Sequence, residues 1–318
     1  MTRSSLRASL VSNEMMLGLL LGTTLIVLSF FSDTFLSTDN LLNQMRLTSE
    51  VGLIAIAMTL VIVTGGIDLS VGSIAGLSAI LLGIFWKSLG MPLPVACLAA
   101  LAVAVACGVA NGVVITRFGV PPLIATLATM AFYRGLAEGL SEGRSVRGYP
   151  ESFYVLGQGE ILGLPSQVAI LALTALVVGV LLAKTAFGRS VYVIGANETA
   201  GRFSGLNVDR VKIVVYGLSG LLSGLAGIIL VSRVTTTRSD MGMGWELEAI
   251  TAVVMGGASI FGGRGTVLGT VLALALIQCL KNGLSLAGVK SDGTIVLIGL
   301  FLIAAVLLGN LMDRIAAR

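Results

Sequence analysis

The chain has 318 residues, of which 56% are hydrophobic and only 11% are charged, and its mean hydropathy is +1.00. Because soluble domains carry about 25% charged residues, this composition excludes an ordinary soluble protein and indicates a membrane protein. The formal net charge of +4 comes from basic residues near the ends of apolar runs, which is typical of membrane topology rather than nucleic-acid binding.

Apolar runs recur along the whole chain, and most are long enough, at about 1.5 Å per residue, to cross or nearly cross a bilayer. They predict an all-α polytopic membrane protein with about ten transmembrane helices. The predicted helices cover residues 15–32, 41–64, 70–85, 94–115, 123–140, 167–183, 213–232, 246–255, 266–280 and 294–311.

Lys and Arg residues are distributed unevenly between the loops that join these helices. If the amino end lies in the cytoplasm, most of them fall on the inner side, in agreement with the positive-inside rule. This orientation places both termini and a polar loop over residues 184–212 in the cytoplasm. It places a second polar loop, over residues 141–165, on the outer side.

One stretch, Gly65-Gly66-Ile67-Asp68-Leu69-Ser70, places a carboxylate and a hydroxyl between two charge-free apolar runs. An ionisable group at membrane depth is costly and is a candidate for function, and the glycines allow the backbone to leave the helix. Gly65, Gly66, Asp68 and Ser70 are therefore candidates for a helix break that lines a translocation pathway. The alternative, of equal weight, is that Asp68 caps the following helix by accepting hydrogen bonds from its free amides.

Other small and polar residues inside the predicted helices are candidates for the same pathway or for helix packing. The polar candidates, each able to face a solute or to hydrogen-bond between helices, are Asn111, Gln278 and Asn282. Glycines spaced four residues apart predict close helix crossings. They include the pairs Gly108/Gly112, Gly135/Gly139 and Gly220/Gly224.

Residues 195–205 of the predicted inner loop carry the signals of a short helix. Asn197 is suited to cap its amino end, Glu198 to complement the helix dipole, and Gly205 to end it in a left-handed turn. A short capped helix between two membrane spans would form a rigid peg that a soluble partner can bind.

A weak internal repeat relates residues 61–66 to residues 253–257. Each segment ends in a pair of glycines, and a further glycine, Gly72 or Gly263, follows. We interpret this similarity as a possible duplicated core; the alternative is chance similarity in a sequence rich in glycine and valine.

The sequence argues against an enzyme. It contains no G-x-x-x-x-G-K-[ST] phosphate loop, no metal-ligand cluster and no nucleophile–base pair. Histidine, the most frequent general base, is absent, and the three cysteines lie inside apolar runs. We therefore expect no catalytic residue, no metal site and no cofactor in this chain.

Four motifs between about residues 41 and 311 form a specific combination. They are Val63-Thr64-Gly65-Gly66-Ile67-Asp68-Leu69-Ser70-Val71-Gly72, Asn111-Gly112, Ile194-Gly195-Ala196-Asn197, and residues 249–257 with Gly262-Gly263. Together they resemble the ribose-type permease family of bacterial ABC importers, which also includes permeases for autoinducer-2. The resemblance implies a single transmembrane permease domain over residues 1–318, located in the bacterial inner (plasma) membrane.

The resemblance also implies partners. A permease of this family works with ABC ATPase subunits that bind ATP and Mg, a periplasmic sugar-binding protein, and a second permease copy or paralogue. Its inner loop docks into the ATPase through residues that here correspond to Gly195, Ala196, Asn197, Glu198 and Ala200; we add Arg202 as a charged neighbour. Membrane lipid is a further expected partner, and nucleic acid is not.

The function implied is translocation of a monosaccharide or related small polyol-like solute, of the ribose, rhamnose, galactose or autoinducer-2 class. One alternative is an ion-coupled secondary transporter in which Asp68 binds the coupling ion. Another is a membrane scaffold or receptor that moves no solute. Neither the sugar nor the choice between homodimer and heterodimer follows from the sequence.

Overall fold

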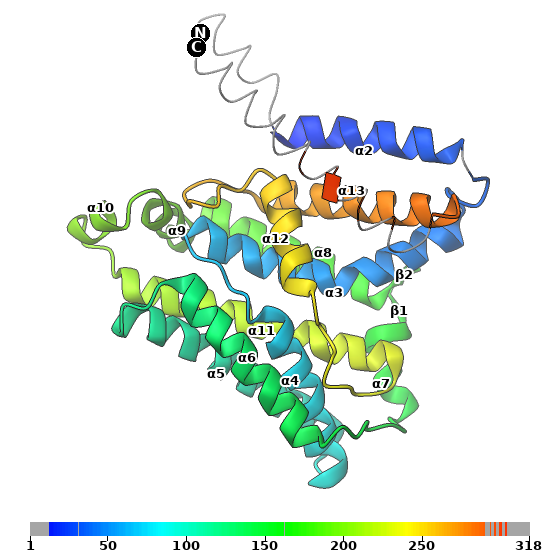
Figure 1. Ribbon diagram of the computed structural model, residues 1–318, viewed down its shortest axis with the longest axis horizontal. Coiled ribbons are helices and arrows are strands. Elements are labelled where there is room, and N and C mark those ends of the chain that lie inside the picture. The colour runs from blue at the N-terminus through cyan, green and yellow to red at the C-terminus, as the bar shows by residue number, and fades with distance from the viewer. Residues whose placement is uncertain are drawn as a thin grey trace, which may run out of the picture.

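The computed structural model describes residues 13–289 apart from 31 and 162, together with residues 293, 296, 299, 300 and 303. Within these residues the chain consists of helices and one small antiparallel hairpin (Figure 1). The elements are α2 (Asn13–Ser29), α3 (Thr38–Val63), α4 (Val71–Gly83), the π-helical η1 (Ile84–Ser88), α5 (Leu93–Arg117), α6 (Pro122–Ser141), α7 (Glu151–Gln158), β1 (Glu160–Ile161), β2 (Leu164–Pro165), α8 (Ser166–Lys184), α9 (Ala186–Ala196), α10 (Glu198–Phe203), α11 (Val208–Val234), α12 (Trp245–Met255) and α13 (Val267–Leu286).

The all-α prediction is confirmed, whereas the count of ten membrane spans is not. Nine of the predicted runs coincide with helices, and the tenth, over residues 294–311, lies almost entirely outside the described residues. Within the described part of the chain, six helices are long and apolar enough to cross a membrane. These are α3, α4 continued by η1, α5, α8, α11 and α13.

Helix α12 is too short to be the membrane span predicted over residues 246–255. Its 11 residues reach only about 16 Å, roughly half of a 30 Å hydrocarbon core. Figure 1 shows α12 running crosswise to the neighbouring α2 and α13. The chain therefore returns between the end of α11 and the start of α13 by a non-helical segment, residues 235–244, followed by this short helix.

The non-helical segment fits against α4 because two glycines of α4 leave space for it. A Cβ added to Gly72 would lie 2.2 Å from the carbonyl oxygen of Gly242, and one added to Gly76 would lie 2.7 Å from that of Met241. The Arg134 guanidinium of α6 donates hydrogen bonds to the carbonyls of Ser239 and Met241. Hydropathy does not predict a non-helical segment of this kind, because its carbonyls accept hydrogen bonds from a residue that is distant in the sequence.

Helices α3 and α11 form the centre of the described fold. Residues 49–63 of α3 are buried on every side, because α8, α11, α12 and α13 all pack against this helix. Helix α11 in turn packs against α4 and α5. A helix that is apolar all round is expected to be enclosed by other helices in this way.

Glycines bring α5 and α11 into backbone contact. A Cβ added to Gly108 would lie 2.1 Å from the carbonyl oxygen of Tyr216, and one added to Gly220 would lie 2.2 Å from that of Ala104. The predicted close crossings at Gly108 and Gly220 are confirmed. By contrast, Gly139 of α6 has no atom within 4 Å of its added Cβ among the described residues, so it makes no such contact.

This contrast gives a matched pair of substitutions. Gly108→Ala is expected to lower the free energy of unfolding by about 2 kcal/mol, because the methyl group forces α5 away from α11. Gly139→Ala is expected to be neutral or slightly stabilising, because alanine favours the helix and open space surrounds the site. Thermal unfolding in lipid nanodiscs measures both, and equal midpoints would contradict the proposed contact.

The two segments of the predicted repeat end in the same turn. The amide of Gly66 donates to the carbonyl of Val61, and the amide of Ala258 donates to that of Val253, both at 3.1 Å. The turn glycines, Gly65 and Gly257, have φ values of 79° and 91°, which side chains disfavour. The two helix ends therefore have the same turn, but Gly65 corresponds to Gly257, one residue later than in the predicted alignment. Duplication of the whole core stays a prediction.

Candidate functional site

A non-helical stretch separates α3 from α4, and we call it the break. The side chain of Asp68 lies completely buried in this stretch. Its Oδ1 atom accepts hydrogen bonds from the amide of Ser70 at 3.0 Å and from the Ser70 hydroxyl at 2.6 Å. Its Oδ2 atom accepts a hydrogen bond from the Ser219 hydroxyl of α11 at 2.8 Å. Three donors thus compensate the carboxylate for the water that it loses on burial.

Helices α5 and α6 complete this buried carboxylate cluster. The amide of Asn111 in α5 donates to the Ser70 hydroxyl at 2.8 Å, and Thr126 of α6 donates to the carbonyl of Ile67 at 3.0 Å. The hydroxyl of Tyr216 is also buried and has no hydrogen-bond partner within the described structure. It lies 2.5 Å from the position that a Cβ on Gly66 would occupy, so a larger residue there would displace the Tyr216 side chain.

The contacts of Asp68 match the predicted helix cap only in part. Asp68 accepts a hydrogen bond from the amide of Ser70, the residue before α4, and no amide of the first turn of α4. The bonds to Ser70 and Ser219, and through Ser70 to Asn111, join the break to α5 and α11. In this conformation Asp68 and Asn111 are enclosed by protein, and their place along a solute path stays a prediction.

The structure places Gln278 and Asn282 at the contact between α13 and α3. Asn282 and Asn40 exchange two amide hydrogen bonds, at 2.8 and 3.1 Å, and Gln278 donates to Gln44 at 2.6 Å. These bonds connect two helices in the way expected of polar side chains inside a membrane. Neither residue lies beside Asp68 in this network, so the sequence candidates form two separate groups.

A double-mutant cycle measures the strength of the amide pair. Asn40→Ala and Asn282→Ala are each expected to destabilise the protein, with a coupling energy of roughly 1 kcal/mol, because each removes the same two hydrogen bonds. Thr270 hydrogen-bonds to Thr59 instead, so Asn40→Ala combined with Thr270→Ala is expected to be additive. Additivity of the Asn40–Asn282 cycle would show that the amide pair does not form.

The short helix predicted over residues 195–205 is confirmed in position, although it is shorter. Helix α10 has 6 residues, and Gly195 and Ala196 belong to the preceding α9. Asn197 caps α10 by accepting a hydrogen bond from the amide of Ala200 at 2.9 Å. Gly205, with φ of 82°, supplies the left-handed turn after the helix.

The charged residues of α10 are paired within the chain. Glu198 accepts hydrogen bonds from Arg202 at 3.0 Å and from Lys212 at 2.5 Å, and Arg202 also pairs with Asp209 at 2.6 Å. Partial burial would raise the pKa of the Glu198 carboxyl, but the bonds from Lys212 and Arg202 outweigh it and hold this pKa below its usual range. The carboxylate therefore stays ionised and ties α10 to the start of α11.

A second contact ties α9 to the end of α3, and we call it the glycine junction (Val63, Gly195, Gly262, Gly263). The amide of Gly263 donates to the carbonyl of Val63 at 2.9 Å. A Cβ added to Gly195 would lie 1.8 Å from that same carbonyl oxygen, and one added to Gly262 would lie 2.6 Å from the Gly195 oxygen. The helix next to α10 thus touches the break that contains Asp68.

Two ion pairs between distant helices were not predicted from the sequence. Glu50, buried in α3, pairs with Arg233 of α11 at 2.7 Å, and Lys281 of α13 pairs with Glu248 of α12. All four residues lie within or beside apolar helices, and an ionisable residue in such a run is a signal for a functional or structural partner. The partner itself could not be found from sequence spacing, because it lies on a distant helix.

Several long apolar helices, one of them interrupted around a buried carboxylate, define the class of polytopic membrane proteins. The family model described as "Branched-chain amino acid transport system / permease component" matches residues 40–306, and the chain belongs to this family. The predicted resemblance to importer permeases is confirmed. No solved structure is significantly similar to the chain.

Curated relatives cover most of the chain. The "Ribose import permease protein RbsC" of Bacillus subtilis is 43% identical over 285 residues, which is 89% of this chain and 88% of the relative. The protein of the same name from Escherichia coli K12 is 40% identical over 292 residues, or 89% of each chain. The "Autoinducer 2 import system permease protein LsrD" of Yersinia enterocolitica is 38% identical over 262 residues, covering 80% of this chain and 79% of the relative.

Proposed function

We propose that this chain is the membrane-spanning permease subunit of a bacterial ABC importer for a monosaccharide or related small polyol-like solute. The observation that carries the proposal is the 43% identity, over nearly nine-tenths of both chains, to a protein named as a ribose import permease. Ribose is the first candidate, and autoinducer-2, rhamnose and galactose belong to the same chemical class. The similarity favours neither a secondary transporter nor a scaffold.

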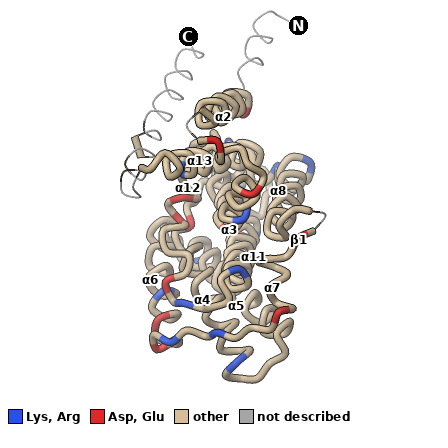
Figure 2. The backbone as a smooth tube through the Cα atoms, turned by 90° about the vertical axis from the view of Figure 1, so that its right-hand side faces the viewer, with Lys and Arg blue, Asp and Glu red and all other residues tan. Residues whose placement is uncertain are grey.

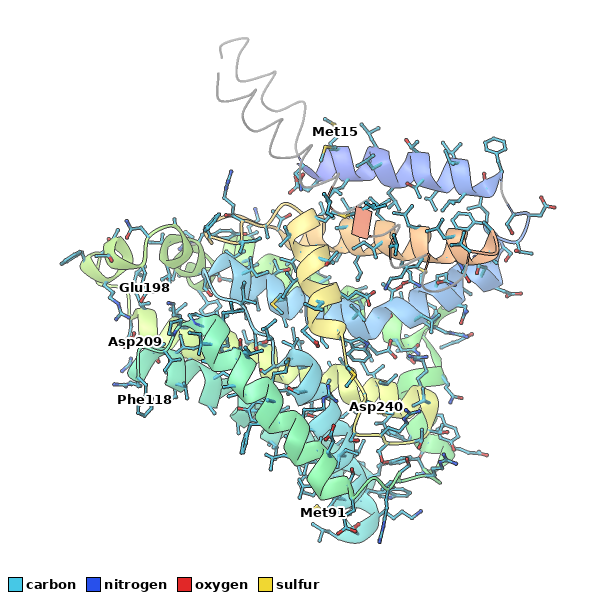
Figure 3. The ribbon with its side chains drawn as sticks, in the orientation of Figure 1. Met15, Met91, Phe118, Glu198, Asp209 and Asp240 are labelled. Atoms are coloured by element: carbon cyan, nitrogen blue, oxygen red, sulfur yellow. The ribbon has the colours of Figure 1, made fainter. Side chains whose placement is uncertain are left out.

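The proposed orientation places the α10 end of the molecule in the cytoplasm, with both termini. Figure 3 shows Phe118, Glu198 and Asp209 at this end, and the basic residues of the 184–212 segment support a cytoplasmic location. The opposite end, with α7 and the hairpin of β1 and β2, would face the periplasm and the binding protein. The proposed partners on the inner side are ATPase subunits that bind ATP and Mg.

Charges on α12 support a second permease copy or paralogue as a further partner. Figure 2 shows the acidic positions of α12 at the edge of the molecule, and Glu246 and Glu248 lie in its first turn. Both side chains are partly exposed. Glu248 already pairs with Lys281 of α13, whereas a carboxylate facing lipid is costly, so Glu246 is expected to face another protein or a water-filled path.

The test is reconstitution of the complete importer. The tagged chain should co-purify with its ATPase and binding protein, and the sugar-loaded binding protein should stimulate ATP hydrolysis in lipid discs. Stimulation by one sugar would identify the substrate. Solute movement by the chain alone, driven by an ion gradient, would contradict the proposal and establish the secondary transporter.

A further inference from the structure

Two phenylalanines stand almost fully exposed at the α10 end. Phe203, the last residue of α10, is 89% exposed, and Phe261, in the loop between α12 and α13, is 91% exposed. Ile260 beside Phe261 is 48% exposed. The glycine junction joins the loop to α9, the helix before α10, because Gly262 packs against the backbone of Gly195. We call Phe203, Ile260 and Phe261, which lie on two separate segments at this end, the apolar patch.

The polar residues around Phe203 do not need a partner, because Glu198, Arg202, Asp209 and Lys212 already pair with one another. The unsatisfied surface of α10 is therefore its apolar side chain. An exposed aromatic side chain gains free energy when a partner removes it from water, and such residues often dominate binding.

The position of the patch favours a soluble protein over lipid as the partner. Figure 1 shows α10 projecting at the far end of the molecule, beyond the ends of the long helices. The exposed residues around it include Arg189, Arg210 and Arg264. A recess of about 250 Å³ lies beside α10 and is lined by Val120, Pro121 and the paired Glu198, Arg202 and Lys212 among others. The exposed phenylalanines and the arginines Arg189, Arg210 and Arg264 suit a folded, acidic surface.

We propose that the apolar patch is the main energetic contact with the ATPase subunit, inserting Phe203 and Phe261 into an apolar cleft bordered by acidic side chains. This inference rests on the proposed function. It assigns to the Glu198–Arg202 network the role of bracing α10, while the phenylalanines make the contact. The charged residues that the sequence singled out thereby act as positioning residues.

The experiment measures binding of the purified ATPase to the full-length chain in lipid nanodiscs. Phe203→Ala and Phe261→Ala are each expected to weaken binding by roughly tenfold or more, as central aromatic contacts do. Phe30→Ala is the matched control, because Phe30 is 84% exposed but follows α2. It should bind like the wild type. Unchanged thermal midpoints of all three variants confirm that each remains folded.

The outcomes separate this inference from the proposed function. If the wild-type chain binds no ATPase, both fail. If the wild type binds and the Phe203→Ala/Phe261→Ala double variant binds equally well, only the patch is overturned. A Phe203→Trp variant, made in a chain whose native Trp86 and Trp245 are replaced by phenylalanine, adds a spectroscopic reading: its fluorescence should shift to the blue on addition of ATPase. Quenching by brominated lipid before the ATPase is added would assign the patch to the membrane surface instead.

Discussion

Replacing Asp68 with alanine is expected to lower the free energy of unfolding by roughly 3 kcal/mol or more. The substitution leaves the Ser70 amide and the hydroxyls of Ser70 and Ser219 buried without their acceptor. Each loses a charge-assisted hydrogen bond and keeps its desolvation cost. Thermal unfolding of the chain in lipid nanodiscs measures the loss.

Two further variants control for this result. Ser73→Ala removes a buried hydroxyl that bonds only the Ser70 carbonyl, at 2.8 Å, and is expected to cost about 1 kcal/mol. Asp68→Asn should fall between the two, because its amide oxygen keeps one acceptor and the Ser219 hydroxyl can accept from its nitrogen. Asp68→Ala as stable as Ser73→Ala would show that the cluster is not a stabilising centre.

Replacing Gly195 with alanine is expected to reduce solute uptake by at least about tenfold. Its methyl group cannot fit 1.8 Å from the Val63 oxygen and 2.6 Å from the Gly263 amide, so α9 must move away from the end of α3. Phe203 on α10 and Phe261 in the loop after α12 both keep their exposed side chains, so the ATPase should still bind, with at most reduced affinity. The importer is expected to hydrolyse ATP without moving solute.

Uptake into proteoliposomes and ATP hydrolysis, measured on the same preparation, test this uncoupling. Gly179→Ala in α8 is the control, because only Val267 approaches its added Cβ, at 4.0 Å, and both activities should be retained. Normal uptake by Gly195→Ala would show that the glycine junction does not couple ATP hydrolysis to solute movement. Loss of ATPase binding would mean that the substitution disrupts α10 as well.

Local signals in the sequence were sufficient to predict most helices and the cap of α10. Hydropathy identified the long helices because they must be apolar along their length, and Asn197 followed from its own side-chain chemistry. These features depend on residues within one or two turns of each other. The same holds for the glycine turn at Gly65.

Contacts between distant segments could not be predicted in this way. Ser219 lies 151 residues from Asp68, and Asn282 lies 242 residues from its partner Asn40. No spacing rule connects such positions without knowledge of which helices are neighbours. The short length of α12 was not predicted for a related reason. The segment before it can stay non-helical because Arg134 on α6, a residue distant in the sequence, donates hydrogen bonds to its carbonyls.

The non-helical segment before α12 also has a consequence for biogenesis. A newly synthesised segment whose backbone N–H and C=O groups have no hydrogen-bond partner is not stable in hydrocarbon by itself. A helix is stable there because its backbone groups bond one another. Thr237 exchanges two hydrogen bonds with Val146, and Arg134 supplies two more to Ser239 and Met241. The two partner residues, Val146 and Arg134, both precede residue 235 in the chain and are therefore synthesised first. The segment can therefore satisfy its backbone groups only once α6, which carries Arg134, has folded beside it.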